Sequence, residues 1–441
     1  MLESLVARVF RHEARRRMRL APSAGIDVAP SEPVFLYLHV PFCEVLCPYC
    51  SFHRVRFEDG KAHRYFAALR QEIRHYHERG FRFSGVYVGG GTPTVVPEEL
   101  FATLNLVREL NPTLGDISVE TNPKDLRDEV LDLLVGAGVG RLSVGVQTFN
   151  DKLLAEMQRL EKYGDRAEIL DRLAAAAGRF RTLNVDMMWN LPHQTAEMLE
   201  DDVATVIASA ANQASFYPLM QSPAAERKMA RTMGLPARRR LPDFYRRILA
   251  GLRPAFTATS AWCFSRGAPG IDEYIAESGD YVGLGSGAFG YVAGTVYATT
   301  FSLKSYVERI ERGESGVTGA RLVGARERMQ YDLLVRLFGL RLERDWVRAR
   351  YGRRFERSLL PELTAFRLIG AIRADARGWS LTDRGMLMWL QMMSAFFESV
   401  NAFREQMRHQ IRAELDDEAL GEALVPLAEL RHGPGTFRRG R

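Results

Sequence analysis

The sequence predicts an α/β fold built on a partial (β/α)6 barrel. About six strand–helix units follow one another between residues 34 and 220, and repeated units of this spacing are typical of parallel β/α architecture. The helical segments show the expected period, because Tyr65, Leu69 and Ile73 lie at helical spacing within 61–79. Glu120 ends one of the strands, where a carboxylate points toward the site face of a barrel.

The expected elements can be placed in chain order. Residues 1–20 predict a basic amphipathic helix, and residues 21–33, with three prolines, predict a linker. After the linker we expect strands and helices in turn: strand 34–40, helix 61–79, a strand from 85 into the glycines at 89–91, strand 116–123, helix 125–137, strand 141–149, helix 165–178, strand 182–190 and strand 214–220.

Length and composition set the bounds for function. A chain of 441 residues with 46% hydrophobic residues accommodates two domains, or one large domain with an appendage. A net charge of +6 is mild for this length and does not indicate nucleic acid. We find no apolar run long enough for a bilayer and no signal-peptide core, so we expect a cytoplasmic location.

Three of the four cysteines lie in one loop, spaced C-x3-C-x2-C at Cys43, Cys47 and Cys50. A structural zinc site needs four ligands in paired spacings, and Cys263 stands alone far along the chain. A disulfide framework needs an even set of cysteines and an oxidising compartment. Three thiolates on a short loop instead suit an iron–sulfur cluster with one iron left open.

The surrounding string, Y-x-H-x-P-F-C-x3-C-x-Y-C-x-F from residue 37 to 52, resembles a known signature. It is similar to that of the radical SAM superfamily, in the branch of oxygen-independent coproporphyrinogen III oxidase, its haem-chaperone relatives and the class C methyltransferases. The resemblance implies a [4Fe–4S] cluster on the three cysteines and S-adenosylmethionine (SAM) on the open iron. It also implies cofactor contacts for Tyr37, Tyr49 and Phe52.

Further matches extend the resemblance beyond the cysteine loop. The stretch Gly89-Gly90-Gly91-Thr92-Pro93 resembles the family loop that binds the methionine end of SAM, and glycine lets a backbone approach a ligand closely. Glu120 matches the family's SAM-binding glutamate. The remaining matches imply a second region, which resembles a second SAM site: Gln147, Arg159 and Asp186. Arg159 rests on spacing alone.

The resemblance also divides the chain into four parts. It implies a barrel core with its extension at 34–300 and a small, mostly helical C-terminal domain at 301–430. The two ends are the basic helix and linker at 1–33 and a disordered tail at 431–441. A winged-helix DNA-binding domain is the alternative for Trp379–Gly385, but the family resemblance speaks against a nucleic-acid partner.

The subfamily is decided by what the chain lacks. Coproporphyrinogen III oxidases carry a fourth cysteine just after the third, where this chain has Ser51-Phe52, and an N-terminal arm motif that we do not find. The haem chaperones carry H-N-x-x-Y-W in the stretch corresponding to 262–275, where this chain has no His-Asn pair. We therefore favour a class C radical SAM methyltransferase, which uses two SAM molecules per site.

For the substrate we expect a planar aromatic molecule, with a menaquinone-type naphthoquinone ahead of a tetrapyrrole. Five side chains offer either a flat apolar pocket or ordinary core packing: Met187, Met188, Trp189, Tyr217 and Met220. Trp189-Asn190 also stands where the family has a small pair, which changes the pocket's shape.

The partners follow from this chemistry. The reduced cluster needs an electron donor such as flavodoxin or ferredoxin. The basic helix at 1–20 either rests on an anionic membrane, which favours the quinone, or packs on the domain. The alternative functions are a haem-modifying or haem-degrading methyltransferase, a coproporphyrinogen III oxidase-like oxidoreductase and a haem chaperone.

Overall fold

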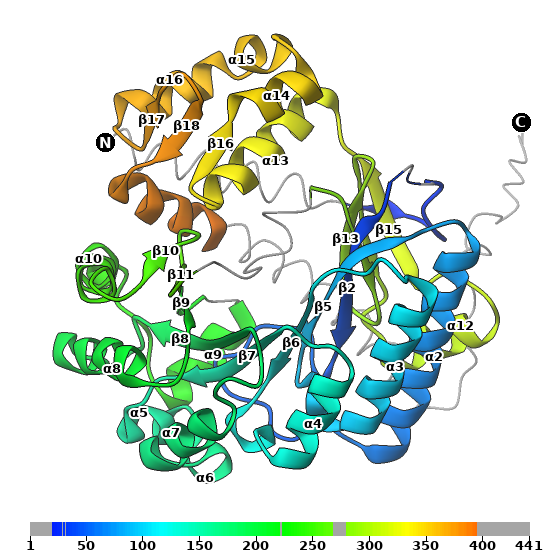
Figure 1. The fold of residues 1–441 in the computed structure, drawn as a ribbon, viewed down its shortest axis with the longest axis horizontal. Coiled ribbons are helices and arrows are strands. Elements are labelled where there is room, and N and C mark those ends of the chain that lie inside the picture. Colours follow the sequence, from blue (N-terminus) through cyan, green and yellow to red (C-terminus); the bar gives the residue numbers. More distant parts are fainter. Residues whose placement is uncertain (1–19, 29, 31, 221–222, 268–278, 395–441) are drawn as a thin grey trace, which may run out of the picture.

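A 13-stranded sheet organises the chain in the computed structural model, which describes residues 20–394 except 29, 31, 221–222 and 268–278. Its strands follow the order β1-β15-β14-β13-β12-β2-β5-β6-β7-β8-β9-β11-β10. The seven from β12 to β9 pair in parallel, and the strands on both sides of them pair antiparallel. Figure 1 shows this sheet as a curved wall with helices along its outer side.

Six of the parallel strands coincide with the six predicted from sequence, which confirms the predicted fold class. They are β2 (Val34–Val40), β5 (Phe83–Gly90), β6 (Ile117–Thr121), β7 (Arg141–Gln147), β8 (Thr182–Trp189) and β9 (Gln213–Pro218). The seventh parallel strand, β12 (Tyr281–Leu284), was not predicted. It pairs with β2 although more than two hundred residues separate them in the chain.

The helices cover the outer face because each buries one apolar stripe against the sheet. In α2 (Asp59–Glu78) the predicted stripe of Tyr65, Leu69 and Ile73 is fully buried, and each such side chain contributes about 1.5–3 kcal/mol. Other helices of this part of the chain are α3 (Pro97–Leu110), α4 (Asp128–Gly136), α5 (Asp151–Glu156), α6 (Leu160–Tyr163), α7 (Arg166–Ala175), α8 (Ala196–Ala208), α10 (Leu241–Leu252) and α12 (Leu303–Glu311). The helix α9 (Pro223–Thr232) instead packs beside the cysteine loop, in one cluster with Cys47 and Tyr49.

The sheet's two edges are antiparallel additions to the barrel. One carries β13 (Phe289–Val292), β14 (Thr295–Thr299) and β15 (Val317–Leu322), and the other carries β10 (Thr257–Ala258) and β11 (Cys263–Ser265). The predicted linker differs from the structure at its start, since Ala21–Pro22 forms β1 and pairs with β15. Proline fits there because β1 is an edge strand.

The inner face of β7, β8 and β9 is polar, while the outer face is apolar. Strand side chains alternate between the two faces, so Asp186 and Met188 lie on one face of β8 and Met187 and Trp189 on the other. Trp189 is fully buried, stacks on Tyr245 of α10 with ring centroids 5.9 Å apart, and donates its indole N–H to the carbonyl of residue 216. The five predicted pocket residues are therefore divided, and Trp189 belongs to the core.

The small C-terminal unit packs on the barrel from above (Figure 1). It contains α13 (Ala325–Phe338), α14 (Arg344–Tyr351), α15 (Arg354–Ser358), α16 (Leu360–Leu368) and a sheet of β16 (Arg341–Glu343), β18 (Gly378–Leu381) and β17 (Ile372–Ala374). Phe338 packs edge-to-face on Trp262 with centroids 4.4 Å apart. α12 packs on α2 and β15 lies in the large sheet, so residues 301–322 are structurally continuous with the barrel.

Some predictions fall outside the described residues. They are the basic helix up to residue 19, the part of the 262–275 stretch from residue 268 onward, and the tail from 395 onward. Among the described helices none is both long and apolar enough to cross a bilayer.

Candidate active site

The cysteine loop leaves β2 and folds back on itself at the carboxyl ends of the parallel strands. Phe42 and Cys43 form β3, which pairs in parallel with Val55 and Arg56 of β4. The amide of Val55 donates to the carbonyl of residue 41 (2.7 Å), and the amide of Phe57 donates to that of Cys43 (2.8 Å). The chain thus returns beside its own entry, and these bonds close the loop that carries the thiols.

All three thiols of the loop are free, with Cys43 and Cys47 buried and Cys50 partly buried. Burial, followed by the nearby Cys50, raises the pKa of Cys43 to about 11. Among the described residues, these thiols form no group tight enough for one metal ion to bridge. A cubane cluster can be bound by thiols that lie farther apart, because each thiolate binds a different iron atom.

Two arginines place positive charge beside the thiols. Arg159 is buried, and its Nη1 donates to Cys47 Sγ (3.8 Å) and to the hydroxyl of Tyr49 (3.3 Å). Arg54 donates from Nη2 to the carbonyls of Cys47 (2.6 Å) and Cys50 (2.9 Å). Three further guanidinium nitrogens are buried and have no hydrogen-bond partner among the residues that the structure describes: Nε and Nη1 of Arg54 and Nε of Arg159. Three thiolates on an iron–sulfur cluster form an anionic group, so this donor set fits it.

The glycine loop is fastened onto the cysteine loop through its backbone. The amide of Gly91 donates to the carbonyl of Val40 (2.7 Å), and the amide of Thr92 donates to that of Phe42 (2.7 Å). A Cβ on Gly91 would lie 2.5 Å from the carbonyl oxygen of Phe42. Gly91 is therefore required by contact between the two loops, whereas the sequence suggested only close approach to a ligand.

Glu120 connects the glycine loop to β6. Its carboxylate accepts hydrogen bonds from the amide of Gly90 (3.0 Å) and from the hydroxyl of Tyr87 (2.9 Å). Burial raises the pKa of Glu120 despite these hydrogen bonds. Gly90 has φ +121°, which favours glycine. A carboxylate held in this way can accept hydrogen bonds from an ammonium group above the loop.

Asp186 lies in a buried polar network inside the barrel. Its carboxylate accepts hydrogen bonds from the Ser143 hydroxyl (2.9 Å) and the Asn184 amide (2.8 Å). Burial raises its pKa to about 7, against the attraction of the buried Arg141. Gln147, at the end of β7, adopts φ +77° where the register with β8 shifts. Such backbone strain in a non-glycine residue is common at functional sites.

Tyr37 is oriented by a histidine to which the sequence analysis gave no role. His39 Nε2 lies 2.9 Å from the carbonyl of His53, which only accepts, so Nε2 carries the proton. The other ring nitrogen, Nδ1, lies 2.8 Å from the Tyr37 hydroxyl and accepts its hydrogen bond when the ring is neutral. The only sequence signal for His39 was its place in the Y-x-H-x-P-F-C string.

The predicted residues gather to different degrees. Hydrogen bonds join Thr92 with Cys43, Arg159 with Cys47 and Tyr49, and Glu120 with Gly90. Asp186 lies deeper in the barrel. It is near enough to Glu120 for the charge of Glu120 to raise the pKa of Asp186. Phe52 is 48% exposed. The sequence analysis missed Arg54, because its short distance from Cys50 along the chain is the only feature that distinguishes it.

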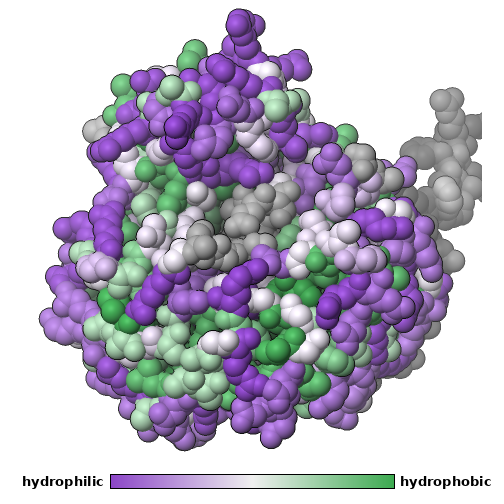
Figure 2. All heavy atoms as spheres, viewed as in Figure 1, coloured by the Kyte–Doolittle hydropathy of each residue, from purple (hydrophilic) through white to green (hydrophobic). Residues whose placement is uncertain are grey.

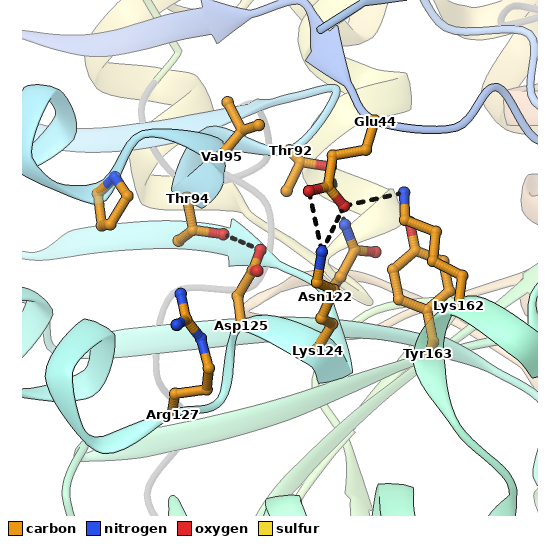
Figure 3. A pocket seen from close by; sticks show the side chains of 11 residues that line it. Glu44, Thr92, Thr94, Val95, Asn122, Lys124, Asp125, Arg127, Lys162 and Tyr163 are labelled. Atoms are coloured by element: carbon orange, nitrogen blue, oxygen red, sulfur yellow. Dashed lines mark hydrogen bonds and ion pairs between the residues drawn. The ribbon is translucent and has the colours of Figure 1, made fainter. Parts of the chain in front are cut away.

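A polar pocket lies beside the cysteine loop (Figure 3). Glu44 points across it toward Lys124 Nζ (2.9 Å) and Lys162 Nζ (3.5 Å). Its other lining residues are Thr92, Thr94, Val95, Pro97, Asn122, Asp125, Arg127 and Tyr163. Thr92 joins this pocket to the cluster loop because its hydroxyl donates to Cys43 Sγ.

A three-cysteine loop, a glycine loop and a buried glutamate at the carboxyl ends of a parallel barrel define a class of protein, that of iron–sulfur proteins with a SAM site. The sequence profile of the Radical SAM superfamily matches residues 37–206. The chain belongs to the radical SAM superfamily, in the branch of coproporphyrinogen III oxidase and the haem chaperone HemW. Its cofactors are a [4Fe–4S] cluster and SAM.

Three relatives illustrate the similarity. The heme chaperone HemW of Bacillus subtilis is 29% identical over 390 residues, or 82% of this chain and 98% of that protein. HemW of Lactococcus lactis is 30% identical over 63% of this chain and 74% of that protein. The oxygen-independent coproporphyrinogen III oxidase of Pseudomonas aeruginosa is 26% identical over 81% and 84%.

A solved structure shares the fold. Coproporphyrinogen III oxidase (HemN) from Escherichia coli, described as a radical SAM enzyme, superposes with a TM-score of 0.70 at 24% identity, covering 82% of this chain and 90% of that one. These comparisons give haem chaperones and coproporphyrinogen oxidases as relatives, and methylation of menaquinone stays a prediction.

Proposed function

We propose that this protein binds a haem-type tetrapyrrole and handles it beside a [4Fe–4S] cluster with bound SAM. The extent of similarity carries this proposal, because the HemW relative is matched over nearly its whole length. For this reason we propose the tetrapyrrole ahead of the quinone that the sequence favoured. Figure 2 shows apolar residues in patches on the lower part of the face in view, with hydrophilic residues between and around them.

Different residues of the chain would hold the cluster and SAM. Cys43, Cys47 and Cys50 hold the cluster, and the Gly90–Thr92 loop with Glu120 holds the amino-acid end of SAM. When bound, the cluster and SAM supply one-electron reductive chemistry. Glu120 contributes a fixed acceptor because its carboxylate is already oriented by the hydrogen bonds of Gly90 and Tyr87. We keep Tyr37, Tyr49, Phe52, Gln147, Arg159 and Asp186 as proposed SAM contacts.

Haem titration tests this proposal. Anaerobically purified holoprotein should bind about one haem per chain, and haem should not be changed in mass when SAM is withheld. Absence of saturable haem binding, with an intact cluster and SAM binding, would rule the proposal out. Binding without any SAM cleavage would support a carrier role like that named for HemW.

Methyl transfer to a planar aromatic is the second candidate, favoured by one specific feature. The stretch at 262–266 has no His-Asn pair, and its cysteine, Cys263, is fully buried in β11. Its thiol is therefore not exposed in this structure. Incubation with SAM and dithionite distinguishes the candidates: 5′-deoxyadenosine together with S-adenosylhomocysteine supports methyl transfer, whereas 5′-deoxyadenosine alone supports an oxidase.

The quinone substrate and a membrane contact belong to this second candidate. Residues 8, 11, 15, 16 and 17 are arginines, and each basic residue near an anionic leaflet contributes roughly 1 kcal/mol. Deleting residues 2–18 should reduce binding to anionic liposomes while cluster content stays unchanged. A host that makes only unmethylated menaquinone should gain a methylated pool; an unchanged pool, with haem methylated instead, favours the tetrapyrrole. A flavodoxin or ferredoxin is the proposed electron donor.

A further inference from the structure

The Arg54 side chain spans the turn that carries the last two cysteines. Its Nη2 donates to the carbonyls of Cys47 (2.6 Å) and Cys50 (2.9 Å), while the amide of Cys50 donates to the same Cys47 carbonyl (3.4 Å). Arg54 directly precedes β4, whose pairing with β3 fixes the main chain at this point. One guanidinium group therefore holds the Cys47–Cys50 turn closed from the side of the returning chain.

The rest of this guanidinium group has no hydrogen-bond partner in the part of the chain that the structure describes. Among the described residues, its Nε and Nη1 are buried and donate no hydrogen bond to any acceptor. Burial alone would lower the pKa of Arg54, but the charges of Cys50, Cys43 and Cys47, in that order, raise it overall. A buried charge with unpaired donors is costly unless an anion completes the site.

We propose that Arg54 is a positioning residue for the cluster, fixing the Cys47–Cys50 turn through Nη2 and donating from Nε and Nη1 to sulfur atoms of the bound cluster. The added charge and hydrogen bonds raise the cluster's reduction potential, because both stabilise the more negative reduced state. This inference concerns the family's cluster and does not depend on the tetrapyrrole proposal.

Arg159 cannot supply the same effect. Its Nη1 and Nη2 are already bonded to Cys47, Tyr49 and the carbonyl of Gly145, and its guanidinium stacks 4.1 Å from the centroid of the Tyr163 ring. It touches one cysteine, whereas Arg54 is close enough to feel the charge of all three. Two buried donor sites remain on Arg54 and one on Arg159.

The test compares Arg54→Met and Arg54→Lys with a matched control, Arg56→Met. Arg56 is two residues further along and exposed to solvent. Each protein is reconstituted anaerobically, and iron content, the EPR spectrum and the midpoint potential are measured. For Arg54→Met we expect the reduction equilibrium to shift at least tenfold toward the oxidised cluster, about 59 mV for one electron. Arg54→Lys should shift less, and Arg56→Met should match the wild type.

Every outcome decides the matter. A loaded Arg54→Met protein with the potential and EPR spectrum of the wild type overturns the proposal. If Arg54→Met takes up no iron, a loaded Arg54→Lys protein decides, with a lowered potential in support and a wild-type potential against. If neither takes up iron while both melt like the cluster-free wild type, the positioning role is supported. If neither folds without the cluster, Arg54 serves the fold and the proposal is wrong.

Discussion

The hydroxyl of Thr92 donates a hydrogen bond to the sulfur of Cys43 across 3.8 Å. Thr92 follows β5 and Cys43 follows β2, so this contact joins the proposed SAM loop directly to the cluster loop. The pairing of β2 with β5, from Val34 with Phe83 to Val40 with Gly90, brings the two loops to the same edge of the sheet. The two cofactor sites therefore share one backbone framework and should respond together when it is disturbed.

The first prediction concerns the cluster ligands. Reconstitution should give about four irons per chain, and changing Cys43, Cys47 or Cys50 to Ala should abolish this uptake because a thiolate is lost. Cys263→Ala is the control, since Cys263 is buried on β11, which pairs with β9. Iron analysis checks the result, and a loss of iron in the Cys263 variant would show the ligand assignment to be wrong.

The second prediction concerns Gly91. Gly91→Ala should lose cluster content as well as SAM binding, because its Cβ would meet the backbone of Phe42 at 2.5 Å and Pro41 at 2.8 Å. Gly60→Ala is the matched control, with nothing within 4 Å of the added carbon. Normal iron content in Gly91→Ala would contradict the contact between the loops.

The third prediction concerns Glu120. Glu120→Gln should keep the cluster but weaken SAM binding about tenfold or more, because a charge-assisted hydrogen bond is worth about 1.5–3 kcal/mol. Equilibrium dialysis with labelled SAM, beside iron analysis, measures both quantities. Glu161→Gln, on the exposed side of α6, should leave both unchanged. Unaltered SAM affinity in the Glu120 variant would remove this residue from the site.

The fourth prediction concerns pH and Asp202. This carboxylate accepts hydrogen bonds from the Phe149 amide (2.7 Å) and the Thr148 hydroxyl (2.8 Å), and burial raises its pKa from 3.8 to about 7. The folded protein therefore binds this proton more tightly than the unfolded chain, so the stabilisation is complete below about pH 4 and is lost as pH rises through 7. Its upper limit is roughly 4 kcal/mol.

Asp202→Asn keeps a side-chain oxygen that can accept the hydrogen bond of the Phe149 amide, but this side chain does not titrate. We expect the melting temperature of the cluster-free variant, relative to that of the cluster-free wild type, to be higher at pH 8 than at pH 5. An equal difference at both pH values would mean that Asp202 does not titrate in this range.

The sequence was sufficient for strands whose pattern is local. β2 ends where the apolar run at 34–40 ends, and the helix over Tyr65, Leu69 and Ile73 differs by only one or two residues from the predicted range. The strand β12 was beyond reach, because its partner β2 lies far away in the chain and four residues carry no periodic signal. The sequence left Trp189 either in a pocket or in the core for a related reason. The period of a strand shows that side chains alternate between two faces, but not which face packs against the helices.

The site shows the same limit. Cysteines, glycines and Glu120 were found because their residue types and order match a motif. Arg54 and His39 act through contacts with backbone carbonyls and a neighbouring hydroxyl, and such contacts have no fixed spacing in sequence. The requirement for Gly91 was predicted, but its physical cause was not, since the opposing Phe42 carbonyl belongs to another strand.

The pairing of β12 with β2 has a consequence for how the protein is made. On one side, the strand β2 that leads into the cysteines pairs with residues 281–284. His53, which follows Cys50 closely in the chain, contacts Ser286, with its Nε2 3.2 Å from the serine hydroxyl. A nascent chain that has not yet emerged to residue 286 therefore presents the cysteine loop with one flank open to water. Iron–sulfur loading should accordingly come after most of translation, and stalled chains ending near residue 260 should fail to retain iron that chains extended beyond residue 322 keep.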